Sequence, residues 1–168
     1  MNAPRRILGI DPGLGITGYG VIEITSSRPA LCEAGIIRTA DDDATDMASK
    51  VLSVYNGVVE VLAQFEPEAM AVEQLYAHYE HPRTAILMGH ARGVIFLAAA
   101  QAEVPVVSYA STQVKKLITG NGRASKEQVQ RTIQGELGLT SIPEPPDVAD
   151  ALAVALCHYY SSRQIQTS

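Results

Sequence analysis

The architecture of this chain follows from residues 7–20, which read Ile7-Leu8-Gly9-Ile10-Asp11-Pro12-Gly13-Leu14-Gly15-Ile16-Thr17-Gly18-Tyr19-Gly20. The apolar residues before Asp11 predict a buried strand, and Pro12, Gly13 and Gly15 end it in a tight turn. A second strand is predicted from residue 19 to residue 25. The first strand therefore delivers the carboxylate of Asp11 to its end. An ordinary Asp-Pro-Gly turn explains this stretch equally well, so a functional interpretation depends on other acidic residues meeting Asp11.

Length and composition indicate one folded, soluble domain. The chain has 168 residues, of which 46% are hydrophobic and 18% are charged, as is typical of globular proteins. Cys32 and Cys157 lie in apolar patterns, which favours two buried free thiols over a disulfide. The longest apolar run, residues 94–102, is shorter than the ~20 residues of a membrane span, and no signal peptide opens the chain. We therefore expect a cytoplasmic single domain over residues 1–168, with a polar tail from about residue 161.

The charge of the chain is unevenly distributed. The formal net charge is −5, yet residues 83–131 hold seven basic and two acidic side chains, a net charge of +5. The rest of the chain holds six basic and sixteen acidic side chains. An acidic protein with one basic region can bind a polyanion through that face. A solvated helical surface explains the same distribution equally well.

Beyond the first two strands, the chain alternates between predicted strands and helices. A third strand over residues 30–38 completes two successive hairpins. Apolar spacing and proline positions predict helices over residues 44–65, 82–102, 112–118, 125–137 and 147–160, with strands over residues 69–73 and 104–109. Hairpins followed by alternating strands and helices indicate an α/β domain with a mixed sheet flanked by helices.

Four carboxylates have the spacing of a metal-dependent catalytic centre. Asp11 ends the first strand and Glu73 the fourth, so parallel pairing would bring them side by side. Asp147 and Asp150 are three residues apart on the last helix and share a face. Four such charges around one point repel, and divalent cations would neutralise them. Oxygen ligands suit Mg²⁺, with Mn²⁺ as a substitute, and two ions ~3.5–4 Å apart suit in-line phosphoryl displacement.

Each of these carboxylates also has a purely structural explanation. Asp147 at a helix start is a good N-cap, and Asp150 in the first turn favours the helix dipole. Glu73 could be a solvated strand end. The four positions together favour a catalytic centre more strongly than any one of them.

Several short motifs occur in order along the chain: Ile10-Asp11-Pro12-Gly13, Thr17-Gly18-Tyr19-Gly20, Ala71-Val72-Glu73-Gln74, Gly89-His90-Ala91-Arg92-Gly93, Gln113-Val114-Lys115 and Asp147-Val148-Ala149-Asp150-Ala151-Leu152-Ala153. Together they resemble RuvC-type Holliday junction resolvases from about residue 6 to residue 158. The resemblance implies an RNase H-like fold with a mixed five-stranded sheet. It also implies a homodimer that makes paired, Mg²⁺-dependent nicks in four-way DNA junctions during recombination and repair. By position, Asp11, Glu73, Asp147 and Asp150 match the catalytic carboxylates of that family.

The same resemblance implies contacts to DNA. Tyr76 matches an aromatic residue, usually Phe, that is thought to stack on a base, and Tyr keeps the π face that stacking needs. Lys115 and Lys126 match lysines near the scissile strand, which could hold phosphates or stabilise developing charge. Weaker candidates for phosphate contacts are Lys116, Arg123 and Arg83. A branch-migration motor of the RuvA and RuvB type is an implied partner.

The predicted helix over residues 82–102 is apolar on more than one face. Gly89 and Gly93 are four residues apart, which allows another helix to approach closely. A core helix in a monomer explains this pattern, whereas the resemblance places the helix near a twofold dimer interface. A twofold dimer would present two metal sites to the two strands of a near-symmetric junction.

Three alternative functions remain to be distinguished. An RNase H-like nuclease acting on RNA or simple duplex would keep the fold and change the substrate; the segment from Gln113 to Lys126 and the Tyr76 match argue against it. An actin-like ATPase or sugar kinase also begins with Asp-x-Gly, but such proteins usually need two such domains. A non-catalytic junction-binding module conflicts with the presence of all four carboxylates.

Overall fold

A computed structural model describes residues 3–39, 46–75 and 81–166. Five strands and five helices are found in these residues. In chain order they are β1 (Arg6–Asp11), β2 (Ile16–Ile24), β3 (Pro29–Arg38), α1 (Met47–Phe65), β4 (Ala69–Glu73), α2 (Pro82–Gln101), β5 (Val106–Tyr109), α3 (Ser111–Thr119), α4 (Lys126–Leu137) and α5 (Pro146–Gln166).

The strands form one mixed sheet in the order β3-β2-β1-β4-β5. β1, β2 and β3 are antiparallel neighbours, as expected of two successive hairpins, while β4 pairs in parallel with both β1 and β5. The predicted α/β class, with a mixed five-stranded sheet flanked by helices, is confirmed. The parallel half of the sheet places the carboxyl ends of β1, β4 and β5 at one edge.

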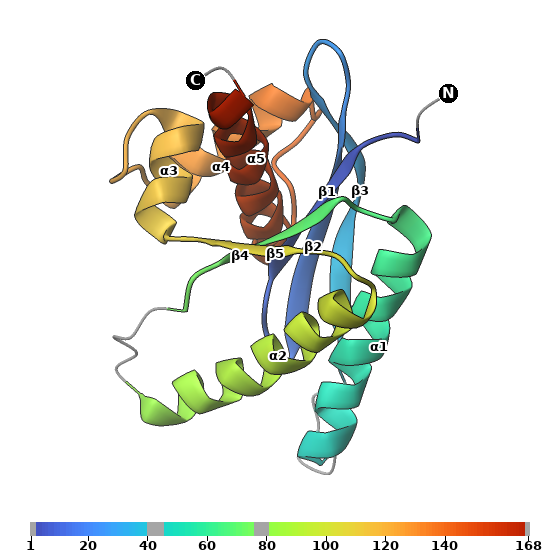
Figure 1. Cartoon of the computed structure of the whole chain (residues 1–168). Coiled ribbons are helices and arrows are strands. Elements are labelled where there is room, and N and C mark those ends of the chain that lie inside the picture. The colour runs from blue at the N-terminus through green and yellow to red at the C-terminus, as the bar shows by residue number, and fades with distance from the viewer. Residues whose placement is uncertain (1–2, 40–45, 76–80, 167–168) are drawn as a thin grey trace.

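Two helical layers enclose the sheet (Figure 1). Helices α1 and α2 cover one face, and α3, α4 and α5 cover the other. Alternate residues of a strand point to opposite faces. In β1, accordingly, Ile7 packs with the α5 layer, whereas Leu8 and Ile10 pack with α1 and α2. Because both faces are covered, β1 is apolar along almost its whole length up to Asp11.

Glycines in β1 and β2 let α5 lie unusually close to the sheet. A Cβ atom on Gly9 would stand 1.9 Å from the carbonyl oxygen of Ala151, and one on Gly18 would stand 2.2 Å from that of Asp147. Real Cβ atoms essentially never approach other heavy atoms so closely. The first turns of α5 therefore rest directly on strand backbone, at the strand ends that carry Asp11 and Glu73.

Several element boundaries differ from those expected, most notably the start of β2 and the end of α5. β2 begins at Ile16 rather than residue 19, because Ile16 already pairs with Arg38 of β3. α5 continues to Gln166, where a polar tail from about residue 161 was expected. Its last turns are held by the Tyr159 phenol, which accepts a hydrogen bond from Arg163 at 2.5 Å.

Helix α2 combines a buried stripe with exposed apolar positions. Ala91 and Ile95 are fully buried, whereas Ile86 is 60% and Leu97 51% exposed. Among the described helices, α2 is the one that is long and apolar enough to cross a membrane by length and composition, and 22% of its most apolar window is buried. One such helix is weak evidence for a membrane span.

Candidate active site

Asp11 and Glu73 lie at neighbouring strand ends. β1 and β4 pair in parallel with Ile10 opposite Val72, and each strand has its carboxylate one residue further on. Beyond Asp11 the chain turns sharply, and buried Thr17 holds that turn. The Thr17 hydroxyl donates to the carbonyl of Gly13 at 2.6 Å. The predicted juxtaposition of these two strand ends is therefore present in the fold.

The first turns of α5 bring Asp147 and Asp150 to the same edge. Contact with Gly18 seats the main chain of Asp147 against β2, and the carboxylate of Asp147 contributes to the raised pKa of Asp11. One turn further along, the Asp150 carboxylate is 3.7 Å from the Lys126 ammonium group. All four predicted carboxylates thus lie around the carboxyl ends of β1 and β4.

Burial and mutual repulsion perturb this cluster. Burial raises the pKa of Asp11 to about 8, and the charges of Asp150, Asp147 and Glu73 add to the rise. Burial also raises the pKa of Glu73, although a hydrogen bond from Ser111 opposes it. Acidic groups held near one another with raised pKa values are characteristic of functional sites.

The donor chemistry of the cluster fits a hard divalent cation. All four side chains offer carboxylate oxygens, the ligands that Mg²⁺ and Mn²⁺ prefer. In residues 3–39, 46–75 and 81–166, no group of three or more acidic, histidine or cysteine side chains is already arranged to hold an ion.

Two small cavities flank Glu73. The first, of about 240 Å³, is lined by Glu73, Ser111, Val114, Lys115, Lys126, Val129, Asp150 and Ala153. The second, of about 170 Å³, is lined by Asp11, Pro12, Glu73, Gln74, Leu75, Met88 and Arg92. Glu73 therefore separates a hollow with two lysines from one with an arginine, and both hollows carry acidic and basic side chains.

The predicted DNA contacts fall into three groups. Lys115 and Lys126 lie beside the carboxylates and line the first cavity. Lys116, Arg123 and Arg83 are exposed on the surface, the last of them in the first turn of α2. Tyr76 lies outside the described residues.

Two further residues contact Glu73 and were not among the predicted site residues. The Arg92 guanidinium donates to the Glu73 main-chain carbonyl at 2.6 Å, and Ser111 lines the same cavity as Glu73 and opposes the rise in the pKa of its carboxylate. A cation in the middle of the apolar helix α2, away from its exposed first turn, was a usable signal for Arg92. Ser111 carried no comparable signal, because a serine at the start of a helix is common.

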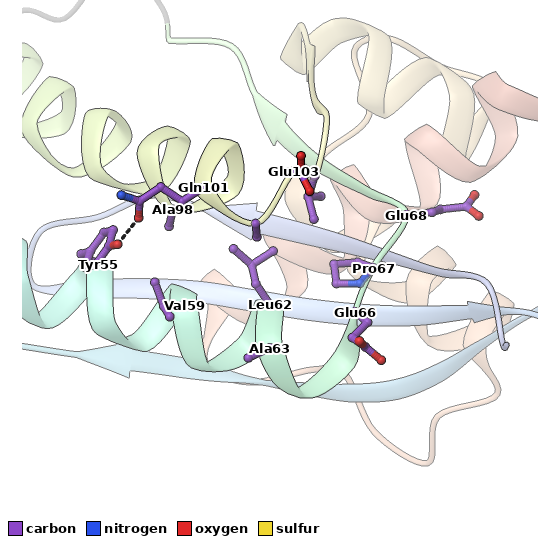
Figure 2. Close-up of a pocket in the computed structure, with 12 residues that line it drawn as sticks. Tyr55, Val59, Leu62, Ala63, Glu66, Pro67, Glu68, Ala98, Gln101 and Glu103 are labelled. Atoms are coloured by element: carbon purple, nitrogen blue, oxygen red, sulfur yellow. Dashed lines mark hydrogen bonds between the residues drawn. The ribbon is translucent and has the colours of Figure 1, made fainter.

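Another cavity lies far from the carboxylates, between the C-terminal ends of α1 and α2 (Figure 2). Leu62 and Ala98 help to form it, the side chains of Tyr55 and Gln101 are hydrogen-bonded beside it, and Glu66, Glu68 and Glu103 also line it. It opens where β4 and β5 begin, at the opposite end of the parallel strands. Its lining holds acidic side chains but no Lys or Arg, whereas the hollows beside Glu73 combine acidic with basic side chains, so the carboxylate cluster remains the candidate active site.

Comparison with known proteins identifies the family of this chain. Residues 7–158 match the family model "Crossover junction endodeoxyribonuclease RuvC". The chain belongs to the RuvC family. The predicted resemblance is therefore confirmed over nearly the whole chain.

Individual RuvC proteins show how near the relationship is. The chain is 53% identical over 154 residues to crossover junction endodeoxyribonuclease RuvC of Rhodopirellula baltica, which covers 92% of this chain and 85% of that protein. It is 46% identical over 152 residues to RuvC of Desulforamulus reducens, covering 90% and 91% of the two chains.

Solved structures extend the comparison to three dimensions. Thermus thermophilus RuvC in complex with Holliday junction substrate superposes with a TM-score of 0.89 at 36% identity, covering 95% of this chain and 96% of that one. The yeast mitochondrial Holliday junction resolvase Ydc2 superposes with a TM-score of 0.67 at 14% identity, covering 97% and 82%, which supports the fold alone. The RNase H-like fold expected of a RuvC-type protein is confirmed.

Proposed function

We propose that this chain is a structure-selective DNA endonuclease that resolves Holliday junctions by paired, symmetric nicks. The observation that carries the proposal is the ring of carboxylates around Asp11, in a chain that belongs to the RuvC family. The superposition on a RuvC protein that holds a Holliday junction substrate supports the same substrate for this chain.

In this proposal Asp11, Glu73, Asp147 and Asp150 are the catalytic residues and the metal ligands. Their oxygen-only chemistry favours Mg²⁺, with Mn²⁺ able to replace it, and two ions would neutralise the cluster. When bound, such ions supply an activated water and stabilise charge on the leaving oxygen. The protein itself contributes the fixed strand ends and α5, which hold the ligands in place before metal and DNA arrive.

The basic residues around the cluster are proposed to hold the DNA. Lys115 and Lys126 line the cavity beside Glu73 and Asp150, so they are positioned to bind phosphate and to stabilise charge that develops on the scissile group. Proposed outer contacts to phosphates are Lys116, Arg123 and Arg83, with Tyr76 stacking on a junction base.

A soluble, cytoplasmic homodimer is proposed as the working form, with a branch-migration motor of the RuvA and RuvB type as its partner. Helix α2 supports the dimer, because Ile86 and Leu97 are exposed apolar residues and Gly89 and Gly93 have open space above them. Two copies related by a twofold axis would offer one carboxylate cluster to each of two DNA strands.

The test is incubation with a synthetic mobile four-way DNA junction in Mg²⁺, in Mn²⁺ and in EDTA, beside linear duplex and an RNA–DNA hybrid. We expect metal-dependent paired nicks in the junction alone. D11N should retain junction binding and lose cleavage. Tight junction binding without cleavage in either metal would favour a non-catalytic binding module. Cleavage of the RNA–DNA hybrid with an intact junction would show that the proposed substrate is wrong.

A further inference from the structure

We infer that Arg92 is a positioning residue for Glu73. From helix α2 it donates a hydrogen bond to the main-chain carbonyl at the end of β4, in place of the N–H that Pro12 lacks. The inference rests on the proposed role of Glu73 as a metal ligand. It assigns a specific task to a residue that touches neither the metal nor the reacting phosphate in the proposed mechanism.

The contact itself is short and shielded in part from solvent. The Arg92 Nη1 atom lies 2.6 Å from the carbonyl oxygen of Glu73, in a partly buried position. The guanidinium also stacks over the ring of Phe96, one turn along α2, at 5.1 Å from the ring centre. A planar guanidinium held on one side by an aromatic ring keeps its donors in a fixed direction.

The register of the sheet explains why the Glu73 carbonyl needs this donor. β1 and β4 are parallel, with Gly9 opposite Ala71 and Ile10 opposite Val72. On the β5 side, Gln74 donates to Tyr109, so the Glu73 carbonyl faces β1. Continuing the parallel ladder by one step places the nitrogen of residue 12 opposite that carbonyl.

Residue 12 cannot make that bond. Pro12 has no main-chain N–H, and it lines the same small cavity as Arg92 and Glu73. A carbonyl left without a donor near the protein interior is costly and allows the strand end to fray. Arg92 supplies the donor instead, so the proline that turns the chain after Asp11 and the arginine of α2 act as a complementary pair.

An electrostatic role and a positioning role of Arg92 predict opposite changes in metal affinity when Arg92 is replaced. If the guanidinium acts only as a charge, its loss beside the carboxylates removes repulsion and strengthens binding of a divalent cation. If it holds Glu73 in place, its loss weakens binding, as removal of groups that orient metal ligands typically does, by 10–100-fold. The sign of the change therefore separates the two roles.

The experiment measures Mn²⁺ binding to the DNA-free protein by electron paramagnetic resonance at pH 9, in the full-length wild type, R92M, R92K, E73Q and R92M/P12A. R28M is the matched control, because Arg28 lies in the β2–β3 turn at the opposite end of the sheet. Thermal unfolding in EDTA reports whether each variant folds, and junction binding in EDTA reports whether the DNA face is intact.

We expect R92M to bind Mn²⁺ on the order of tenfold more weakly than wild type. R92K should lose less of the Mn²⁺ affinity, and R28M should bind Mn²⁺ as wild type does. P12A restores an N–H at residue 12, so R92M/P12A should recover part of the lost affinity. Unchanged or tighter binding in R92M, or no recovery in R92M/P12A, would overturn the inference. If E73Q also binds Mn²⁺ like wild type, the proposed metal site itself fails, and with it this inference.

Discussion

Asp11 carries the least favourable charge in the cluster. Its side chain is largely buried and faces three other carboxylates, which together raise its pKa to about 8. Near neutral pH in the absence of metal, the folded protein therefore holds a proton on Asp11 that the unfolded chain, with an ordinary aspartate pKa near 4, has released. A cation that replaces this proton removes the repulsion.

Replacing Asp11 by Asn should stabilise the metal-free protein at alkaline pH. Because the folded-state pKa lies above the unfolded one, the contribution of Asp11 to stability is fully present below about pH 4 and is lost as the pH rises through about 8. In EDTA, D11N should therefore unfold at a higher temperature than wild type at pH 9, with a difference that shrinks towards pH 5. Asp46, an exposed N-cap, provides the control D46N. A pH-independent difference for D11N would contradict the perturbed pKa.

The lysines beside the cluster should affect cleavage more than binding. Lys115 and Lys126 line the cavity next to Glu73 and Asp150, where negative charge develops on the phosphate in the proposed mechanism. K115M and K126M should each reduce the single-turnover cleavage rate by on the order of 100-fold, as loss of one charge-stabilising donor does, while R28M has no effect. A loss of junction affinity that accounts for the whole rate change would instead make these lysines ordinary phosphate contacts.

At the scale of elements, the position of α5 on the sheet determines where half of the cluster lies. Asp147 and Asp150 belong to a helix whose main chain rests on glycines of β1 and β2. The close approach depends on the missing side chains, because any Cβ atom there would push the helix outward. The same contact explains why the first turns of α5 meet the ends of β1 and β4.

Gly18→Ala should therefore displace Asp147 and disable the site. A Cβ atom on Gly18 would lie 2.2 Å from the Asp147 carbonyl oxygen, whereas one on Gly15 would have open space. Overpacking of this kind costs about 1–3 kcal/mol, so G18A should lower the unfolding temperature and abolish cleavage, and G15A should do neither. Wild-type cleavage by G18A would show that α5 does not need this contact.

At the scale of the whole molecule, α2 has an exposed apolar face, with Ile86 and Leu97, that other described parts of the monomer do not cover. Gly89 and Gly93 have no atoms near their Cβ directions within the described residues, and large apolar side chains flank them. Glycine in a helix interior costs stability relative to other residues. The presence of Gly89 and Gly93 on the exposed face of α2 is consistent with the close approach of a second copy of the chain.

Gly93→Gln should stabilise the monomer and weaken the dimer. Glutamine favours the helix by a few tenths of a kcal/mol or more over glycine, and it places a bulky polar side chain on the proposed interface. Light scattering with size exclusion should show dimers dissociating at higher concentrations, and junction nicks should become unpaired. Gly135→Gln on α4, also an open helical glycine, should leave both unchanged. A fully dimeric G93Q protein would place the interface elsewhere.

Local patterns were enough to predict much of this molecule. Apolar spacing and proline positions predicted every described strand and helix, because those features depend on neighbours along the chain. The end of α5 was predicted too early, because its last turns are held in part by a tertiary contact, in which the Tyr160 hydroxyl donates to the Glu136 carboxylate of α4. Asp11 and Glu73 could be paired in advance because both directly end predicted parallel strands.

The sequence by itself therefore determined the α/β class, the order of the elements, the acidic residues of the cluster and the RuvC resemblance. Only the tertiary structure decided how α5 reaches the sheet through Gly9 and Gly18, and how Arg92 meets the carbonyl of Glu73. These contacts join residues that are far apart in the sequence, so the local sequence pattern around either residue does not predict the contact. They exist because strand register and close main-chain packing bring distant segments together, and that packing is a property of the folded chain as a whole.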